Sequence, residues 1–219
     1  MGELEVSNRT LLMLGGTGGL GKQLIETLQY DYEIEALGSK DCDIRSAGEV
    51  ARVIKYSMPD YILNLAVVNY DAVLHKTDTT LIQDQLEVNL VGNINVLHSG
   101  IEFFRSVGKP GKIILMSSIL ASRPLPGTGI YGACKAAVEH LVQTAALENG
   151  SKNITINAIE AGYFDAGLMH RIPKDIQTKI IDSIPMKRLG NVEELANTIR
   201  FIFEVDYVNG SSIKIAGGL

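Results

Sequence analysis

The sequence predicts an α/β fold, a doubly wound parallel sheet, in a single domain. A length of 219 residues suits one hydrophobic core. Short apolar or β-branched runs alternate with helical stretches, as in a parallel sheet covered on both faces. Hydrophobic residues make up 46% of the chain, and no linker or repeat divides it. We therefore treat residues 1–219 as one domain.

The first strands surround a glycine-rich turn. Thr10–Leu14 is expected as the first strand, followed by a helix over Leu20–Gln29. Glu33–Leu37 is expected as a second strand and Asp41–Ile44 as a brief third. Because a complete crossover needs a dozen or more residues, the helix between these two strands is expected to be shortened or absent. The later strands are expected over Tyr61–Val67, Lys112–Met116, Asn153–Ile159 and Ser211–Ile215.

The remaining helices follow from apolar residues at helical spacing. They are expected over Ala47–Tyr56, about Thr80–Val107, Tyr131–Glu148, Pro173–Ser183 and Val192–Phe203. In the longest of them the apolar stripe consists of Leu86, Leu90, Ile94 and Leu97.

Composition excludes several classes of function. The net charge is −5 with both signs mixed along the chain, which argues against nucleic acid as a partner. No basic segment precedes an apolar stretch and no apolar run approaches the roughly 18 residues of a membrane span, so a cytoplasmic protein without membrane contact is expected. Cys42 and Cys134 are expected as free thiols. The four histidines lack metal-ligand spacing, so no metal is expected.

A glycine-rich run joins the first expected strand to the first expected helix. Glycine lets backbone approach a diphosphate closely, and the helix start offers N–H groups to it. A plain strand-to-helix turn is the alternative. The candidate contacts are Gly15, Thr17, Gly18, Gly19, Leu20 and Gly21.

A second constellation lies in the middle of the chain. Tyr131 and Lys135 are four residues apart, so a helix presents both on one face. An ammonium near a phenol favours the phenolate, so we expect the pKa of Tyr131 to be lowered from its usual value near 10. Ser118 ends an expected strand upstream, with Ser117 as the neighbouring alternative. Singly, Ser118 is also explained as a strand-end cap and Tyr131 as a helix-start aromatic.

These motifs, in this order, resemble the short-chain dehydrogenase/reductase family over nearly the whole chain, Thr10–Leu219. The resemblance implies a Rossmann fold and the catalytic set Asn89, Ser118, Tyr131 and Lys135. Tyr131 is then the proton donor, Lys135 also holds the nicotinamide ribose, and Ser118 polarises the substrate oxygen. Asn89 supports a water-mediated proton relay behind Lys135, although a surface or kink residue explains it equally well on its own.

The resemblance also implies coenzyme contacts at the ends of several strands. Asp43 and Ile44 would meet the adenine, and Asn64 and Ala66 the adenosine side. On the nicotinamide side the implied contacts are Ala161, Gly162 and Phe164. The chain departs from the family pattern at three positions, where Leu14 and Ala166 replace Thr and Ala161 replaces Pro.

The end of the second expected strand predicts the coenzyme. An acidic residue there would bind the ribose 2′-OH of NADH and repel a 2′-phosphate. The chain has Gly38-Ser39-Lys40, whose hydroxyl and ammonium suit a phosphate, which predicts NADPH. NADH remains the alternative if Lys40 is solvated and Asp41 or Asp43 faces the ribose.

Two C-terminal stretches, Met186–Glu194 and Gly210–Gly218, resemble the 3-oxoacyl-(acyl-carrier-protein) reductase branch. The resemblance implies reduction of a 3-oxoacyl thioester on acyl carrier protein or coenzyme A, by a homotetramer or homodimer. Arg123, Arg171 and Lys174 are candidates for a basic rim that docks the acidic carrier. Alternatives are a dehydrogenase of a sugar, steroid or secondary-metabolite alcohol, and a nucleotide-binding regulator without turnover.

Overall fold

A computed structural model describes residues 9–219. Within this range six strands form one sheet, and all neighbouring strands are parallel. The strand order is β2-β1-β3-β4-β5-β6, which confirms the predicted doubly wound arrangement. The strands are β1 (Thr10–Leu14), β2 (Glu33–Leu37), β3 (Tyr61–Asn64), β4 (Gly111–Ser118), β5 (Ile154–Ala161) and β6 (Ser212–Ile215).

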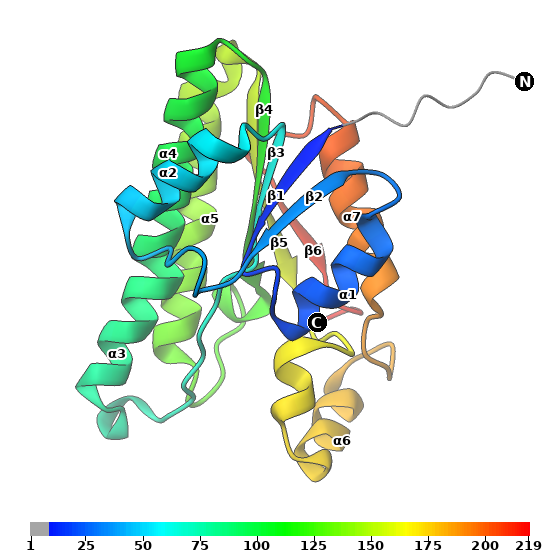
Figure 1. The fold of residues 1–219 in the computed structure, drawn as a ribbon. Helices are drawn as coiled ribbons and strands as arrows, with labels where there is room; N and C mark the ends of the chain where they lie inside the picture. The colour runs from blue at the N-terminus through cyan, green and yellow to red at the C-terminus, as the bar shows by residue number, and fades with distance from the viewer. Residues whose placement is uncertain (1–8) are drawn as a thin grey trace, which may run out of the picture.

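Helices cover both faces of the sheet (Figure 1). One face carries α1 (Gly19–Leu28) and α7 (Val192–Glu204), and the other α2 (Ala47–Ser57), α4 (Gly92–Val107) and α5 (Gly129–Asn149). The remaining helices, α3 (Thr79–Leu86) and α6 (Lys174–Ser183), extend beyond the carboxyl edge of the sheet (Figure 1). Each face has its own apolar core because both faces of a parallel sheet are buried.

The predicted third strand is wrong. Asp41–Ile44 is a turn and loop between β2 and α2, so the strand is missing. The helix that was expected to be shortened or absent is absent. Cys42 and Ile44 nevertheless point into the core, each with 4% of its surface exposed. The alternation of acidic and apolar residues in Asp41–Ile44 is typical of a strand. In the structure the two apolar side chains are buried from a loop instead.

The long helix is interrupted where continuous α-helix was expected. Residues Glu87–Val91 form a π-helical segment between α3 and α4. The wider turn changes the phase of the residues that follow, so the predicted apolar stripe is only partly buried. Leu97 is 5% exposed, whereas Leu86 is 39% and Ile94 is 41% exposed.

Two predictions about the whole chain are addressed by the described residues. Cys42 and Cys134 are buried free thiols, as expected. Within residues 9–219, no helix combines the length and apolarity that crossing a membrane requires.

Candidate active site

The glycine-rich turn packs too tightly for any side chain. Gly15 has a φ of 73°, and a Cβ there would lie 2.5 Å from the backbone nitrogen of Ala66 at the end of β3. A Cβ at Gly21 would collide with the carbonyl of Gly16. The backbones of β1, β3 and α1 therefore approach one another at this turn too closely to admit a side chain.

The start of α1 is suited to an anion. Gly18 is the N-cap and carries no side chain, and no described side chain caps the first turn. Gly19 lies against the segment after β5, since a Cβ there would be 3.1 Å from the Cα of Gly167. Uncapped N–H groups beside glycine backbone fit the diphosphate of a dinucleotide.

Two of the predicted contact residues pack against the elements that flank this turn. Thr17 lies against Gly38, where a Cβ would collide with the Thr17 hydroxyl. Leu20 follows in the first turn of α1 and lies against Gly167. The glycine-rich turn is thus held between the end of β2 and the segment after β5.

On the adenosine side, the acidic side chains are engaged within the protein. The Asp41 carboxylate accepts the backbone N–H of Gly38 at 2.9 Å. The Asp43 carboxylate pairs with Arg45 at 2.7 Å, and Arg45 also reaches Asp84 of α3 at 3.1 Å. Arg45 lowers the pKa of Asp43, chiefly through the hydrogen bond from its side chain.

Ser39 and Lys40 lie in the turn after β2 and are exposed. Ile44 is buried against Gly92 of α4. The predicted adenine contact through Asp43 therefore competes with the ion pair between Asp43 and Arg45. Ser39 and Lys40 face solvent at the end of β2.

The end of β3 is held by buried amides. The Asn64 side chain donates to Asn93 at 2.9 Å and accepts the backbone N–H of Ala66 at 3.1 Å. Asn93, on α4, was not predicted; nothing in its spacing distinguishes it from the other polar residues of that helix. Together these bonds fix the backbone that faces Gly15.

Tyr131 and Lys135 lie on one face of α5, as predicted. Lys135 is 1% exposed, and its Nζ donates to the carbonyl of Met116 on β4 at 2.7 Å. The same Nζ lies 5.5 Å from the centre of the Tyr131 ring. Burial lowers the pKa of Lys135 to about 8. A lysine with this pKa is mostly protonated at neutral pH and loses its proton more readily than an exposed lysine.

The expected lowering of the Tyr131 pKa is wrong for this arrangement. Burial raises the pKa of Tyr131 to about 12, and the Ser118 hydroxyl opposes that shift only in part. The Lys135 ammonium is directed at Met116 and the ring face, so desolvation of the phenolate dominates. The Tyr131 phenol is consequently protonated at physiological pH.

The structure distinguishes Ser118 from Ser117. The Ser117 hydroxyl donates to Glu139 of α5 at 2.6 Å, so it is directed into the helix packing. Ser118 interacts with Tyr131, and its Oγ accepts the backbone N–H of Leu120 at 3.2 Å. An oxygen that already accepts one hydrogen bond keeps its own proton for a substrate oxygen. Ser118 is thus both a cap, as the alternative had it, and an available donor.

Asn89 lies in the π-helical segment and is fully buried, so it is not a surface residue. Its side chain accepts the backbone N–H of Val68 at 3.1 Å and donates to the Val68 carbonyl at 2.7 Å. Asn89 therefore fastens the loop after β3 to the long helix. π-helical segments are frequent at functional sites.

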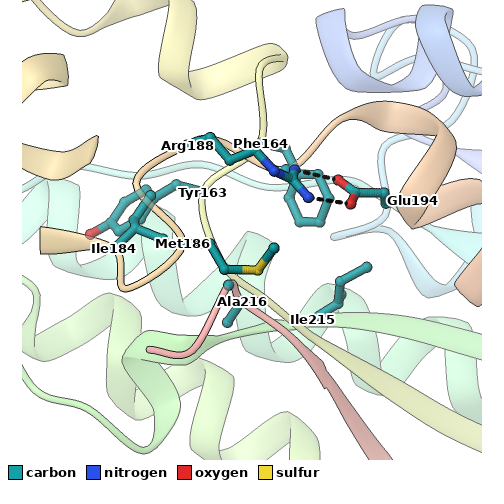
Figure 2. Close-up of a pocket in the computed structure, with 10 residues that line it drawn as sticks. Tyr163, Phe164, Ile184, Met186, Arg188, Glu194, Ile215 and Ala216 are labelled. Carbon is teal, nitrogen blue, oxygen red and sulfur yellow. Dashed lines mark hydrogen bonds and ion pairs between the residues drawn. The ribbon is translucent and has the colours of Figure 1, made fainter. Parts of the chain in front are cut away.

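The segment after β5 lies beside a small cavity. Gly162 passes close to Ala216, where a Cβ would lie 2.7 Å from its Cα. Phe164 is buried and pairs with Gly190, so Ala161, Gly162 and Phe164 form a fixed wall. A cavity of about 100 Å³ lies beside Phe164, and its lining includes the Arg188–Glu194 ion pair at 2.7 Å (Figure 2). It is lined by Tyr163, Phe164, Ile184, Met186, Arg188, Gly190, Glu194, Ile215, Ala216 and Gly217.

The carboxyl edge of the sheet thus brings the predicted residues together from β1, β3, β4, β5 and the helices between them. Among the described residues no cluster of metal-ligating side chains is found. Sequence reasoning missed Asp71, whose charge acts on Tyr131, because it lies in a loop without periodic pattern.

The parallel sheet and the glycine-rich turn are typical of dinucleotide-binding α/β proteins. A family model described as Enoyl-(Acyl carrier protein) reductase matches residues 17–219. The chain belongs to the short-chain dehydrogenase/reductase family, whose members are NAD(P)-dependent oxidoreductases.

Curated relatives span the chain at modest identity. A 3-oxoacyl-[acyl-carrier-protein] reductase FabG of Staphylococcus epidermidis is 26% identical over 243 residues, covering 97% of this chain and 99% of the relative. A (3R)-3-hydroxyacyl-CoA dehydrogenase of Canis lupus familiaris is 30% identical over 185 residues, covering 81% of this chain and 71% of the relative. These relatives support the predicted branch without fixing a substrate.

Solved structures share the fold. One, described as ElxO with NADP bound, has a TM-score of 0.85 at 23% identity and covers 96% of this chain and 98% of its own. Another, a small-chain dehydrogenase in complex with NADPH, has a TM-score of 0.86 at 20% identity, with 97% and 98% covered. At these identities the likeness is one of fold.

Proposed function

We propose that the protein is an NADPH-dependent reductase that converts a ketone to a secondary alcohol. The observation that carries this proposal is the juxtaposition of Tyr131, Lys135 and Ser118 at the carboxyl edge of the sheet. Lys135 in particular is a buried cation, and desolvating an ammonium costs free energy. Its presence in the interior is therefore better explained by a function than by packing.

NADPH, when bound, supplies hydride from the nicotinamide C4 to the carbonyl carbon. Gly15 and the uncapped start of α1 would hold its diphosphate, and Lys135 the ribose hydroxyls. Ser39 and Lys40 would bind the 2′-phosphate, since the carboxylates of Asp41 and Asp43 are engaged elsewhere. The NADP and NADPH found in the two structures of similar fold accord with this choice.

The protein's own residues supply polarisation and the proton. Ser118 donates its hydroxyl proton to the substrate carbonyl oxygen, and Tyr131 delivers a proton to the oxygen as negative charge develops. A phenol with a pKa near 12 stays protonated until that charge forms. Asn89 is assigned to the water-mediated proton relay behind Lys135, held in place by its two bonds to Val68.

We assign the substrate to 3-oxoacyl thioesters on acyl carrier protein or coenzyme A. The names of the Staphylococcus and Canis relatives support this class. Arg123, Arg171 and Lys174 would form the basic rim for an acidic carrier. Reversing the charge of Arg171 should raise KM for the carrier-bound substrate, and an unchanged KM would contradict the docking role.

A polar alcohol is the second candidate substrate. The charge of Asp71 acts on both Tyr131 and Tyr163, and Arg123 acts on Tyr163, so charged groups lie close to the reacting centre. Such a lining suits a sugar or another hydroxylated substrate better than an unfunctionalised acyl chain.

We propose a homotetramer or homodimer in the cytoplasm, with no nucleic acid or membrane partner. The partly exposed apolar side chains of Leu86, Val91 and Ile94 along the long helix support self-association. Light scattering during size-exclusion chromatography should give the mass of two or four chains. The mass of a single chain would contradict the proposed oligomer.

Substrate panels with both coenzymes test the proposal. Acetoacetyl-CoA and a set of sugar and steroid carbonyls are each incubated with NADPH or NADH, and loss of the reduced coenzyme is followed by absorbance. Turnover of acetoacetyl-CoA with NADPH supports the first candidate, and preferential turnover of a sugar supports the second. Coenzyme binding without turnover of any substrate would refute a reductase and favour a regulator.

A further inference from the structure

Glu160 is a buried carboxylate that the reaction above does not use. It is the seventh residue of β5 and only 7% exposed. Its strand neighbours in the sheet are Ser117 on β4 and Lys214 on β6. A buried carboxylate lowers stability unless it is paired and hydrogen-bonded, so its partners indicate what keeps it there.

Two groups hold the same oxygen of Glu160. The Ser122 hydroxyl donates to Oε1 at 2.6 Å, and the Lys214 ammonium lies 3.1 Å from it. Lys214 is 44% exposed, so the ammonium neutralises the carboxylate from the solvent side. Lys214 lies on the neighbouring strand β6, whereas the bond to Ser122 ties β5 to the turn after β4.

Ser122 closes the turn that Ser118 opens. Ser118 caps the short helix Ile119–Ala121 through the N–H of Leu120, and the backbone N–H of Ser122 donates to Ile119 at 3.3 Å. The turn is therefore fixed at one end by Ser118 and at the other by Glu160.

We propose that Glu160 is a positioning residue that holds the Ser118 hydroxyl in place through Ser122. This inference rests on the proposed reductase function. Misplacing a polarising group by about 1 Å lowers the rate by roughly 100-fold, so loss of the tie should affect turnover more than coenzyme binding.

The test compares Glu160→Ala, Glu160→Gln and Ser122→Ala. Glu160→Ala should lower kcat by roughly 10- to 100-fold while the dissociation constant for NADPH changes less than about threefold. Glu160→Gln should recover most of kcat, because its amide oxygen still accepts from Ser122. Ser122→Ala should lower kcat similarly, and the double variant should be no worse than either single one.

Asp206→Asn is the matched control. Asp206 pairs with Lys112 of β4 at 2.6 Å, so the variant breaks a lysine–carboxylate pair at the opposite edge of the sheet, one in which the carboxylate is the exposed partner. Its kcat should match that of wild type. An equal loss of kcat in Asp206→Asn, or wild-type kcat in Glu160→Ala, would overturn the inference, as would failure of Glu160→Gln to recover activity.

Amide hydrogen exchange separates this inference from the proposed function. In Glu160→Ala, exchange at Leu120–Arg123 should rise while β5 stays protected. A wild-type protein without reductase turnover would refute the proposed function, but increased exchange in this turn would still show that Glu160 holds it. Unchanged exchange would overturn the tie itself.

Discussion

The two ends of the proposed coenzyme site are built by different interactions. At the adenosine end, Asp43, Arg45 and Asp84 form ion pairs between side chains that are 29–44% exposed. At the nicotinamide end, Lys135 is 1% exposed and bonded to the β4 backbone. The first end lacks the strand that was expected over Asp41–Ile44, and the helix that was expected to be shortened or absent is absent there.

This difference implies that the adenosine end determines how tightly the coenzyme binds, whereas the nicotinamide end determines how precisely the reacting groups are placed. Exposed ion pairs contribute about 0–1 kcal/mol each, whereas buried and hydrogen-bonded groups tolerate little displacement. We expect the reacting groups to be rigidly placed and the adenosine end to bind weakly. The dissociation constant for NADPH is accordingly expected to exceed about 1 μM, and a submicromolar value would contradict this.

Lys135→Met should give the largest effect. Turnover should fall by at least about 1000-fold, because the cation that binds the ribose is lost. The free energy of unfolding should stay equal or rise by about 1 kcal/mol, because an apolar side chain replaces a buried ammonium. Kinetics and urea unfolding measure the two quantities, and a large loss of stability would mean that Lys135 serves the fold.

Gly15→Ala should lower the free energy of unfolding by about 2–4 kcal/mol, from a left-handed backbone and a collision with Ala66. Gly48→Ala is the control: nothing lies within 4 Å of its added Cβ, and alanine in a helix should raise stability by roughly 0.5–1 kcal/mol. Equal stability of both variants would contradict the close approach of β1 and β3.

Stability should depend on pH through Lys135. Its pKa is lowered to about 8 in the folded protein, whereas the unfolded chain keeps the usual value near 10.4. Between these values the unfolded state binds more protons, so its contribution makes stability rise by up to ~1.4 kcal/mol per pH unit. The difference in unfolding free energy between wild type and Lys135→Met, measured from pH 7 to 10, should show this rise; a flat difference would contradict it.

Lys40→Ala tests the adenosine end. The dissociation constant for NADPH should rise about tenfold with that for NADH unchanged, since one charge-assisted bond to the 2′-phosphate is lost. Lys55→Ala removes an exposed cation from α2 and should change neither. An equal rise in the dissociation constants for both coenzymes would show that Lys40 does not bind the 2′-phosphate.

Arg45→Leu should have the smallest effect. The free energy of unfolding should fall by less than about 1 kcal/mol, and the deficit should shrink in high salt. Chemical unfolding at two ionic strengths measures it. A salt-independent loss above ~2 kcal/mol would show that the charge cluster builds the fold and would erase the contrast between the two ends.

Much of the fold was predictable because burial imposes period and length. Strands such as Lys112–Met116 are confirmed, with a few residues added at their ends. The expected strand Asp41–Ile44 failed because two buried apolar residues in a loop resemble a short strand. The π-helical segment Glu87–Val91 left no periodic signal, so the buried face of the following helix was misplaced.

The catalytic candidates were recognisable because their spacing reflects helix geometry and strand ends. The pKa of Tyr131 was not predictable, since the direction of the Lys135 ammonium depends on the Met116 carbonyl. Glu160 and Asn93 were missed for a similar reason: their partners, Ser122 and Asn64, are distant in sequence and defined only by packing.

Turnover of acetoacetyl-CoA with NADPH by wild type and Tyr131→Phe tests the central claim most directly. We expect measurable reduction by wild type, a loss of at least about 1000-fold in the variant, and coenzyme binding within about threefold of wild type. Equal turnover by the two proteins would show that the Tyr131 phenol does not deliver the proton.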